Sequence, residues 1–265
     1  MNHKTLTPAD KAKFDKDGYV LIKGMLTPEE AEKLYQIAVG DEVISSKSFD
    51  RGDANGLRTK LALWYSLGND IYSLLARSER IVHGAALLLD AEPAHFHSKL
   101  MQKEPKVGGA WEWHQDYGYW YRDGFLYPQM LSVLTALSPS TRQNGCLQVL
   151  KGSHLLGRIE HGFSGEQVGA SQERIDVLLE QLELVYVEME AGDVLFFHSN
   201  TLHRSDANLS DKPRWSLISA YNNINNKPFK GDYPSATEAI RVVGDDSILD
   251  FNGTGIQADA DFLIK

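Results

Sequence analysis

The fold of this chain is decided by the stretch His95-Phe96-His97-Ser98-Lys99-Leu100-Met101-Gln102-Lys103, where the sequence changes from helical to strand-like periodicity. Further runs with strand character follow it, at residues 131–137, 145–150, 184–190, 194–198 and 215–221. Turn signals such as Asn144-Gly145 and Ala191-Gly192-Asp193 separate these runs. Many short strands after a helical first third predict a mainly β fold, a sandwich or barrel supported by helices.

The segment before this stretch predicts helices on either side of one strand. Two Thr-Pro pairs each provide an N-cap followed by a proline, which favours helices over about 9–16 and about 28–39. Residues 19–23 lie between them, and their β-branched and aromatic side chains predict a strand. Further along, we expect a loop over residues 41–60 and a helix over about 73–89.

Nothing in the sequence divides the chain into separate domains. It contains no internal repeat, no low-complexity segment and no linker rich in Pro, Gly or Ser. We therefore expect one domain over residues 1–265, with N-terminal helical support over about 1–92 and a β core over about 93–225. Residues 155–183 predict a polar, partly helical insertion in that core.

The composition is that of a globular protein with an acidic balance. The 265 residues are 42% hydrophobic and 24% charged, which excludes collagen-like, coiled-coil and mainly disordered chains. The 27 Lys and Arg against 36 Asp and Glu give a net charge of -9, which disfavours nucleic acids and anionic membranes as partners. No apolar run approaches the ~20 residues that cross a bilayer. Cys146 is the single cysteine, so an internal disulfide cannot form, and we expect a cytoplasmic location.

The segment Trp111-Glu112-Trp113-His114-Gln115-Asp116-Tyr117 holds a candidate pair of metal ligands. In a strand, residues i and i+2 point to the same face, so His114 and Asp116 would lie side by side. They would supply two thirds of a 2-His-1-carboxylate triad, which binds iron(II) and leaves positions open. The spacing alone is weak, because His-x-Asp is common by chance. Either His198 or His203 could supply the third ligand.

A later strand carries an arginine that calls for an anionic partner. Alternation over Arg214-Trp215-Ser216-Leu217-Ile218-Ser219 puts Arg214 and Ser216 on one face of an otherwise core-like strand. A buried guanidinium is costly unless a carboxylate pairs with it, and its fork suits a bidentate carboxylate.

Several segments, taken in their order along the chain, resemble the phytanoyl-CoA dioxygenase-like family of Fe(II)/2-oxoglutarate-dependent oxygenases. The resemblance runs from about residue 14 to 221, and it rests on residues 14–20, 26–31, 113–116, 144–154, 192–205 and 213–214. It implies a double-stranded β-helix core, the jelly-roll or cupin-like fold, with flanking helices. It also implies that the chain is an enzyme, with iron(II), 2-oxoglutarate and O2 as cofactor and co-substrates.

The resemblance assigns roles to individual residues. It places His114, Asp116 and His203 as the iron ligands and hence the catalytic centre, and it favours His203 over His198 through the spacing of eleven residues to Arg214. Arg214 would bind the far carboxylate of 2-oxoglutarate. Ser205, Ser216 and Lys99 are expected as further cofactor contacts.

The implied reaction is hydroxylation of an unactivated C–H bond of a small organic molecule, with release of succinate and CO2. Related halogenases lack the carboxylate ligand, so Asp116 favours hydroxylation, while desaturation or other oxidative outcomes stay open. We expect a polar amine, an amino acid or an aminophosphonate as substrate. The alternatives are an acyl-CoA hydroxylase, a non-catalytic jelly-roll sensor and a Zn- or Mn-dependent cupin-like enzyme. The oligomeric state is left open.

Other side chains around the expected ligands have less specific roles. Trp120 resembles an aromatic residue near the cofactor in the ectoine-hydroxylase branch, and Tyr117 and Tyr121 are expected in the substrate pocket. Such an aromatic group could hold an ammonium cation. We expect structural roles for His95 and His97, half-buried on one strand face, for His154, bonded to a loop backbone, and for Cys146, buried as a small hydrophobe.

Overall fold

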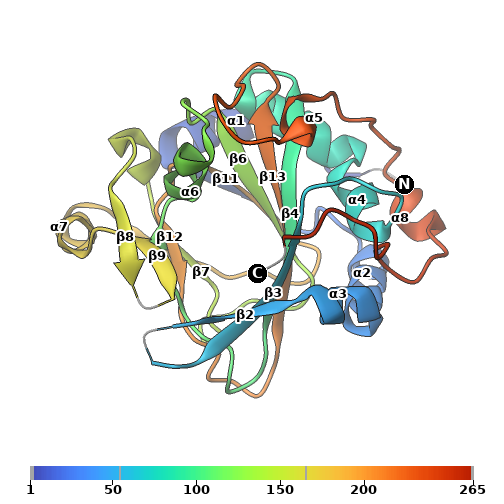
Figure 1. Ribbon diagram of the computed structural model, residues 1–265, viewed down its shortest axis with the longest axis horizontal. Coiled ribbons are helices and arrows are strands. Elements are labelled where there is room, and N and C mark those ends of the chain that lie inside the picture. The colour runs from blue at the N-terminus through green and yellow to red at the C-terminus, as the bar shows by residue number, and fades with distance from the viewer. Residues whose placement is uncertain (1–2, 54, 165, 264–265) are drawn as a thin grey trace.

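A computed structural model describes residues 3–53, 55–164 and 166–263. Two antiparallel sheets face each other and enclose the interior of a barrel (Figure 1). The seven-stranded sheet has the order β1 (Tyr19–Ile22), β11 (Val194–His198), β6 (Met130–Ala136), β13 (Arg214–Asn223), β4 (Pro93–Lys103), β3 (Arg58–Trp64) and β2 (Phe49–Gly52). The four-stranded sheet has the order β10 (Leu184–Val187), β7 (Leu147–Leu150), β12 (His203–Ser205) and β5 (Trp111–His114). This confirms the predicted jelly-roll class.

A hairpin of β8 (His161–Ser164) and β9 (Gln167–Ala170) lies beside β5 and forms the third sheet. Together with α7 (Gln172–Gln181) it makes up most of the predicted insertion. In Figure 1 this unit lies at the edge of the four-stranded sheet, away from the helices on the opposite side.

Helices cover the outer face of the seven-stranded sheet. They are α1 (Pro8–Asp17), α2 (Pro28–Gly40), α3 (Glu42–Lys47), α4 (Ile71–Ala76), α5 (Glu79–Leu89) and α8 (Ser247–Asp250). The remaining helical elements are α6 (Asp116–Asp123) and two 3-10 turns, η1 (Ser153–Leu156) and η2 (Pro234–Thr237). Thr7 and Thr27 cap α1 and α2 through complete capping boxes, as the Thr-Pro pairs predict. No described helix is both long and apolar enough to span a bilayer.

Two apolar cores hold these layers together. The larger one packs the helices against the outer face of the seven-stranded sheet, with Trp64, Tyr72 and Phe196 among its fully buried side chains. The second lies inside the barrel and includes Leu134, Val149 and Leu195 from facing strands. The barrel is therefore packed at one end, and its site lies towards the other.

Three predictions for the first third are wrong in detail. Residues 41–60 form α3, β2 and the start of β3 rather than a loop, and the helix expected over 73–89 is two helices, which break at Arg77 and Ser78. The N-terminal support also contributes β1, β2 and β3 to the seven-stranded sheet. Polar and charged residues concealed β2 and the start of β3, because β2 buries only Gly52 and β3 opens with Arg58, Thr59 and Lys60.

A β-bulge in β4 overturns the expected placement of two histidines. His97 pairs with Ala220 and His95 pairs with Tyr221, so Phe96 has no partner across the strand. A bulge shifts the alternation by one residue. His97 therefore lines the cavity that contains the metal ligands, while His95 lines a cavity on the other side of the strand. Both side chains are buried rather than half-buried.

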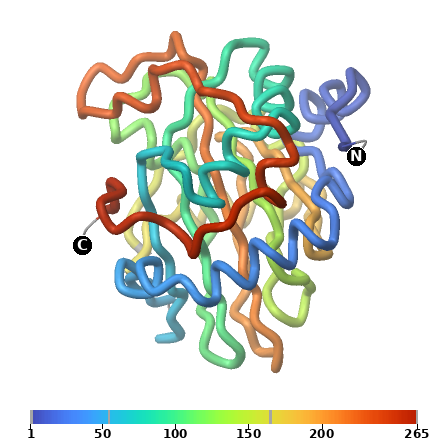
Figure 2. The backbone as a smooth tube through the Cα atoms, turned by 90° about the vertical axis from the view of Figure 1, so that its right-hand side faces the viewer, coloured from blue at the N-terminus to red at the C-terminus, as the bar shows by residue number. Residues whose placement is uncertain are grey.

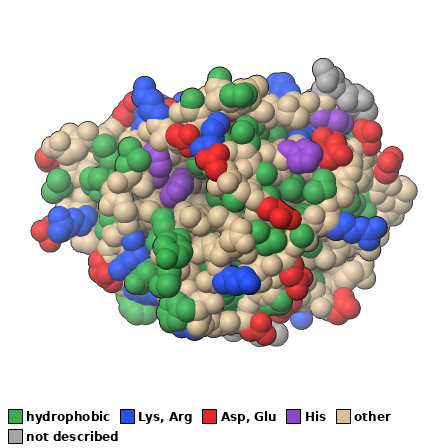
Figure 3. Space-filling model, turned by 90° about the horizontal axis from the view of Figure 1, so that it is seen from above, with side chains coloured by type: hydrophobic (Ala, Val, Ile, Leu, Met, Phe, Trp, Pro, Cys, Tyr) green, Lys and Arg blue, Asp and Glu red, His purple; other side chains and the backbone are tan. Residues whose placement is uncertain are grey.

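The C-terminal segment crosses the outside of β3, where Trp64 and Phe262 form an isolated bridge (Figure 2). On the face seen from above, acidic and basic side chains are interspersed with hydrophobic ones (Figure 3). That face shows no large block of a single charge.

Candidate metal centre

Three side chains from three elements meet inside the barrel. His114 ends β5, His203 begins β12, and the two residues are direct cross-strand partners with ring centroids 4.0 Å apart. Asp116 Oδ1 lies 3.7 Å from His114 Nε2 and 3.9 Å from His203 Nε2. One ligand atom from each residue lies within 4.8 Å of the others, and all three residues are buried. Among the described residues, this is the one group of this kind.

Asp116 reaches the two histidines by a route that strand alternation does not predict. β5 ends at His114 and α6 begins at Asp116, so the carboxylate comes from the first residue of a helix. Gln115 fixes this junction, because its backbone N–H donates to His161 Nε2 at 2.9 Å and its amide donates to the carbonyls of Gly157 and Asn200. The expectation that His114 and Asp116 lie on one strand is thus wrong. The two side chains are nevertheless adjacent, as that expectation required.

Hydrogen bonds orient each of the three groups. His114 Nδ1 lies 2.7 Å from the carbonyl of Glu112, and His203 Nδ1 lies 2.9 Å from that of Thr201. Donation to these carbonyls leaves each Nε2 lone pair free and turned towards Asp116. Ser132 donates to Asp116 Oδ2 at 2.5 Å, which leaves Oδ1 to face the histidines. Two neutral imidazoles and a carboxylate suit iron(II) and occupy one side of it, so the residues fit that ion.

The electrostatics agree with this arrangement. Burial, with a smaller contribution from the charge of Lys99, lowers the pKa of His114 and His203, and the charge of His203 further lowers the pKa of His114, so both rings are neutral at pH 7. Burial alone would raise the pKa of Asp116, but Lys99, the two histidines and the Ser132 hydrogen bond outweigh it and lower that pKa. The carboxyl group of Asp116 is therefore ionised at pH 7 even without a bound metal ion.

Arg214 and Ser216 lie inside the barrel with unused hydrogen-bonding atoms. Arg214 is 5% exposed and donates from Nη1 to the carbonyl of Gly145, while its Nε and the Oγ of Ser216 have no partner among the described residues. Burial lowers the pKa of Arg214 to about 10, which leaves it charged at pH 7. A carboxylate would satisfy both orphaned atoms, so these residues fit the far end of 2-oxoglutarate.

The space beside Arg214 and Ser216 is small as it stands. Its volume of about 10 Å³ is that of a single water, and its lining includes Leu134, Leu147 and Met189. A carboxylate can enter only after some of these side chains move.

Lys103 is a second buried cation that the sequence does not single out. It is the register partner of Arg214, its side chain is fully buried, and it donates to Ser205 Oγ at 2.8 Å and to the Asp206 carbonyl at 2.6 Å. Burial first, and the charge of Arg214 second, lower the pKa of Lys103. The i, i+2 spacing from Lys99 to Met101 and Lys103 on one strand was the available signal. Ser205, a predicted cofactor contact, thus contacts Lys103.

The metal ligands His114 and Asp116 line a cavity of about 370 Å³. Most of its apolar lining is aromatic or leucine, and nearly half of its lining residues are polar or charged. Lys99 and Trp120 from the sequence analysis lie in this lining, and Lys99 Nζ is 3.9 Å from Asp116 Oδ1. His97 is present there because of the bulge in β4.

Tyr117 and Tyr121 do not line this cavity, which corrects their expected place in the substrate pocket. Tyr117 is buried in another cluster and donates to the Phe125 carbonyl, and Tyr121 is exposed under the guanidinium of Arg158. The reason is the helix α6, whose inner face repeats every three to four residues. It presents Asp116, Tyr119, Trp120 and Asp123 to the cavity.

The other histidines have the structural roles that their context suggested. His154 Nε2 lies 3.0 Å from the Asp15 carbonyl, as expected for a loop contact. His198 packs near His154 and Phe14, and its Nδ1 accepts the backbone N–H of Asn200, away from the metal ligands. Cys146 is buried.

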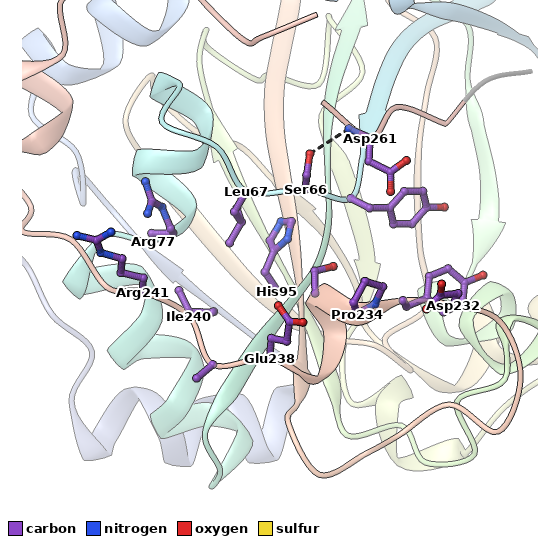
Figure 4. A pocket seen from close by; sticks show the side chains of 14 residues that line it. Ser66, Leu67, Arg77, His95, Asp232, Pro234, Glu238, Ile240, Arg241 and Asp261 are labelled. Carbon is purple, nitrogen blue, oxygen red and sulfur yellow. Dashed lines mark hydrogen bonds between the residues drawn. The ribbon is translucent and has the colours of Figure 1, made fainter. Parts of the chain in front are cut away.

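The largest cavity described, about 640 Å³, is not the one that holds the metal ligands (Figure 4). It lies on the other side of β4, beside His95, with Arg77 and Arg241 at one end and Asp232 at the other. Tyr65 lines both cavities. We place the chemistry in the smaller cavity, because the group of metal-ligating side chains lies there.

Known proteins share this fold and this order of motifs. The model of the phytanoyl-CoA dioxygenase family matches residues 14–216. Ectoine dioxygenase from Nocardia farcinica is 26% identical over 246 residues, which cover 84% of this chain and 81% of that protein. L-proline trans-4-hydroxylase from Streptomyces griseoviridis is 25% identical over 235 residues, with 82% and 87% covered. The crystal structure of EctD from S. alaskensis with 2-oxoglutarate and 5-hydroxyectoine has a TM-score of 0.73 at 23% identity, covering 92% of this chain and 90% of that one.

Proposed function

Because this chain belongs to the phytanoyl-CoA dioxygenase family and is an iron(II)- and 2-oxoglutarate-dependent dioxygenase, we propose that it hydroxylates an unactivated C–H bond of a small polar amine or amino acid. The observation that carries this proposal is the buried group of His114, Asp116 and His203, two of which, His114 and Asp116, line a cavity of about 370 Å³. Ectoine dioxygenase and L-proline trans-4-hydroxylase, both similar to this chain over most of its length, carry names that indicate small polar substrates.

The three ligand residues would hold the metal from one side, and Arg214 with Ser216 would hold the far carboxylate of 2-oxoglutarate. When bound, iron(II) with 2-oxoglutarate and O2 supplies an oxidant for a C–H bond, and succinate and CO2 are the co-products. Ser132 keeps Asp116 Oδ1 turned to the histidines. Trp111 and Tyr119 pack against the ring of His114, and Trp120 lines the same cavity, so these rings would limit the access of water to a bound metal ion.

The size of the cavity and the net charge of the chain support a small substrate over an acyl-CoA thioester. Its volume of about 370 Å³ is at the lower end of the range for small-molecule sites. The net charge of -9 also disfavours a bulky polyanion. We further propose that the chain acts as one domain in the cytoplasm, without nucleic-acid or membrane partners; its single, buried cysteine is in keeping with a reducing compartment.

Anaerobic titration tests the enzyme class and the assigned ligands together. Addition of iron(II) and then 2-oxoglutarate should give a metal-to-ligand charge-transfer band, and His114→Ala or Asp116→Ala should abolish both the band and succinate release. His198→Ala is the matched control, since that histidine lies outside the cavity, and it should leave the band unchanged. A parent protein that shows no band, or a fully active Asp116→Ala variant, would contradict the assignment. A screen of amines and amino acids for stimulated succinate release then identifies the substrate.

A further inference from the structure

Asp123 is a largely buried carboxylate that makes no ion pair or hydrogen bond within the described parts of the chain. It is the last residue of α6 and lines the cavity of the metal ligands. Burial raises its pKa to about 6, and the charge of Lys230 opposes that shift only in part. A carboxylate at the C-terminal end of a helix also faces the negative end of the helix dipole. Both effects cost stability, so the fold itself gives no reason for an acidic residue at this position.

Aromatic rings surround the space that Asp123 faces. Tyr65, Phe96 and Trp120 line the same cavity. Phe96 packs edge-on against Trp120 with ring centroids 5.7 Å apart, and Tyr65 lies 6.0 Å from Phe96. Tyr233 packs behind them, 5.2 Å from Phe96 and 5.8 Å from Tyr65. Aromatic rings that line a cavity can hold an ammonium group over a ring face, so this cluster offers the side chains that such a group needs.

The other charged side chains of this cavity have partners within it or at its rim. Asp116 is the metal ligand, and Lys99 lies 3.9 Å from it. Glu166 forms an ion pair with Arg58 at 3.1 Å and accepts the backbone N–H of Gly52. The guanidinium of Arg51 stacks on the ring of Phe49. Asp123 is therefore the carboxylate of the cavity lining that forms no ion pair in the described structure, although the charge of Lys230 acts on it from a longer distance.

We propose that Asp123, together with Tyr65, Phe96 and Trp120, forms a subsite for a cationic ammonium group of the substrate. This rests on the proposed function, since the subsite and the metal ligands share one cavity. The helix sets the spacing: seven residues separate Asp116 from Asp123, a rise of roughly 10 Å at 1.5 Å per residue. The substrate is then a molecule whose ammonium group lies several bonds from the carbon that reacts.

The test uses two probes of similar shape and different charge. The parent enzyme, loaded anaerobically with iron(II) and 2-oxoglutarate, is titrated calorimetrically with tetramethylammonium and with neutral 2,2-dimethyl-1-propanol. We expect tetramethylammonium to bind at least about tenfold more tightly than the alcohol, and Asp123→Asn to remove that preference. Asp232→Asn is the matched control. It removes an exposed carboxylate of the other cavity and should not change binding.

The pH dependence provides a second readout. Ionised Asp123 is the form that attracts a cation, so the affinity for tetramethylammonium should rise as pH increases through about 6 and should not do so in Asp123→Asn. The other titratable groups near Asp123 are Lys230, Tyr65 and Tyr233. The two tyrosines do not account for such a step, because burial raises the pKa of both.

Asp123→Asn should also fold at least as well as the parent. A carboxyl group whose folded-state pKa is raised weakens the fold once pH exceeds its unfolded value near 4, and the full cost is reached above about 6. The variant should therefore have the higher melting temperature at pH 7.5 and the same one near pH 4.

The outcomes separate this inference from the proposed function. A charge-transfer band in both proteins, with the cation preference lost in Asp123→Asn, supports the subsite. A band in both with no cation preference in the parent, or with equal preference in the variant, overturns the subsite and leaves the dioxygenase intact. Absence of the band in the parent overturns the proposed function itself.

Discussion

At the scale of single residues, the barrel contains two buried cations side by side without an acidic partner. Arg214 and Lys103 are opposite each other in β13 and β4, and no carboxylate within the described residues lies at ion-pair distance from either. Such a pair is unfavourable by itself, because burial acts against the charge of both groups and the charge of Arg214 also acts against that of Lys103. It becomes favourable when a dianion such as 2-oxoglutarate enters, so these residues favour the co-substrate over neutral molecules.

Removing either charge should weaken the binding of 2-oxoglutarate more than it slows the chemical step. Arg214→Ala should raise the 2-oxoglutarate concentration for half-maximal rate by at least about tenfold with a smaller change in kcat, because it removes uniform binding. Lys103→Met should also raise this concentration, but by a smaller factor, since Lys103 lies beside Arg214 and contacts Ser205. Lys106→Met is the control, because that exposed lysine pairs with Asp211. Unchanged half-saturation in Arg214→Ala would count against the role of that residue.

The residue scale is also where the sequence was most informative. The spacing of His114 and Asp116 and the charge of Arg214 on a core-like strand drew attention to these residues, but it was the resemblance to a known family that selected His203 over His198 and completed the set. Tyr117 and Tyr121 could not be placed in the same way. Their exposure depends on whether residues 116–123 form a strand or a helix, and the aromatic composition is compatible with both.

At the scale of elements, the site depends on the transition from β5 to α6. Gly118 lies on α6 where the His161 ring packs against the helix, and a Cβ at this position would overlap that ring. His161 in turn accepts the backbone N–H of Gln115, between the two metal ligands. The hairpin of β8 and β9 thus holds the start of α6 in place, which gives the insertion a role in positioning the ligands.

Gly118→Ala should therefore loosen the metal site although alanine is the better helix former by about 1 kcal/mol. We expect the iron(II) affinity to fall by about tenfold, measured by anaerobic titration, while the far-UV circular dichroism stays unchanged. Gly162→Ala in β8 is the matched control, since a Cβ there meets no atom within 4 Å. Equal iron(II) affinity in Gly118→Ala and the parent protein would show that the His161 ring can move aside without disturbing the metal ligands.

Elements also explain where the sequence-based prediction of the fold fell short. The strands with apolar faces, such as β6 and β11, were predicted to within one residue because burial on both faces produces a continuous apolar run. β2, β5 and β12 are short and carry polar or functional residues, so they produce no such run. The bulge at Phe96 leaves no signature in the sequence, because any residue can be the extra one.

At the scale of the whole molecule, one buried ion-pair cluster joins the helical layer to the C-terminal segment. Arg80 on α5 pairs with Glu30 on α2, and both side chains are fully buried. Arg80 also donates to the Met25 carbonyl and lies 3.4 Å from Asp245. Glu30 in addition completes the capping box of Thr27. The cluster connects residues that lie far apart in the chain, and it anchors the helices that cover the seven-stranded sheet.

Glu30→Gln should lower the free energy of unfolding by about 3 kcal/mol, because it leaves the Arg80 charge buried with only Asp245 nearby. Urea denaturation followed by circular dichroism measures this loss. Glu29→Gln, an exposed neighbour in the first turn of α2, should change stability by less than about 0.5 kcal/mol. A similar small change in Glu30→Gln would mean that the cluster positions the helices without stabilising them.

The helix α6 has a consequence for any attempt to redesign this enzyme. Its first residue faces the metal ligands and its last faces the proposed ammonium subsite, so one insertion between them would rotate Asp123 by about 100° out of the cavity. Selectivity libraries should leave α6 intact and diversify the part of the lining that β3 contributes, at Leu61 and Leu63. Those positions can change the width of the cavity, whereas the length of α6 sets the distance between the reacting end and the ammonium end of a bound substrate.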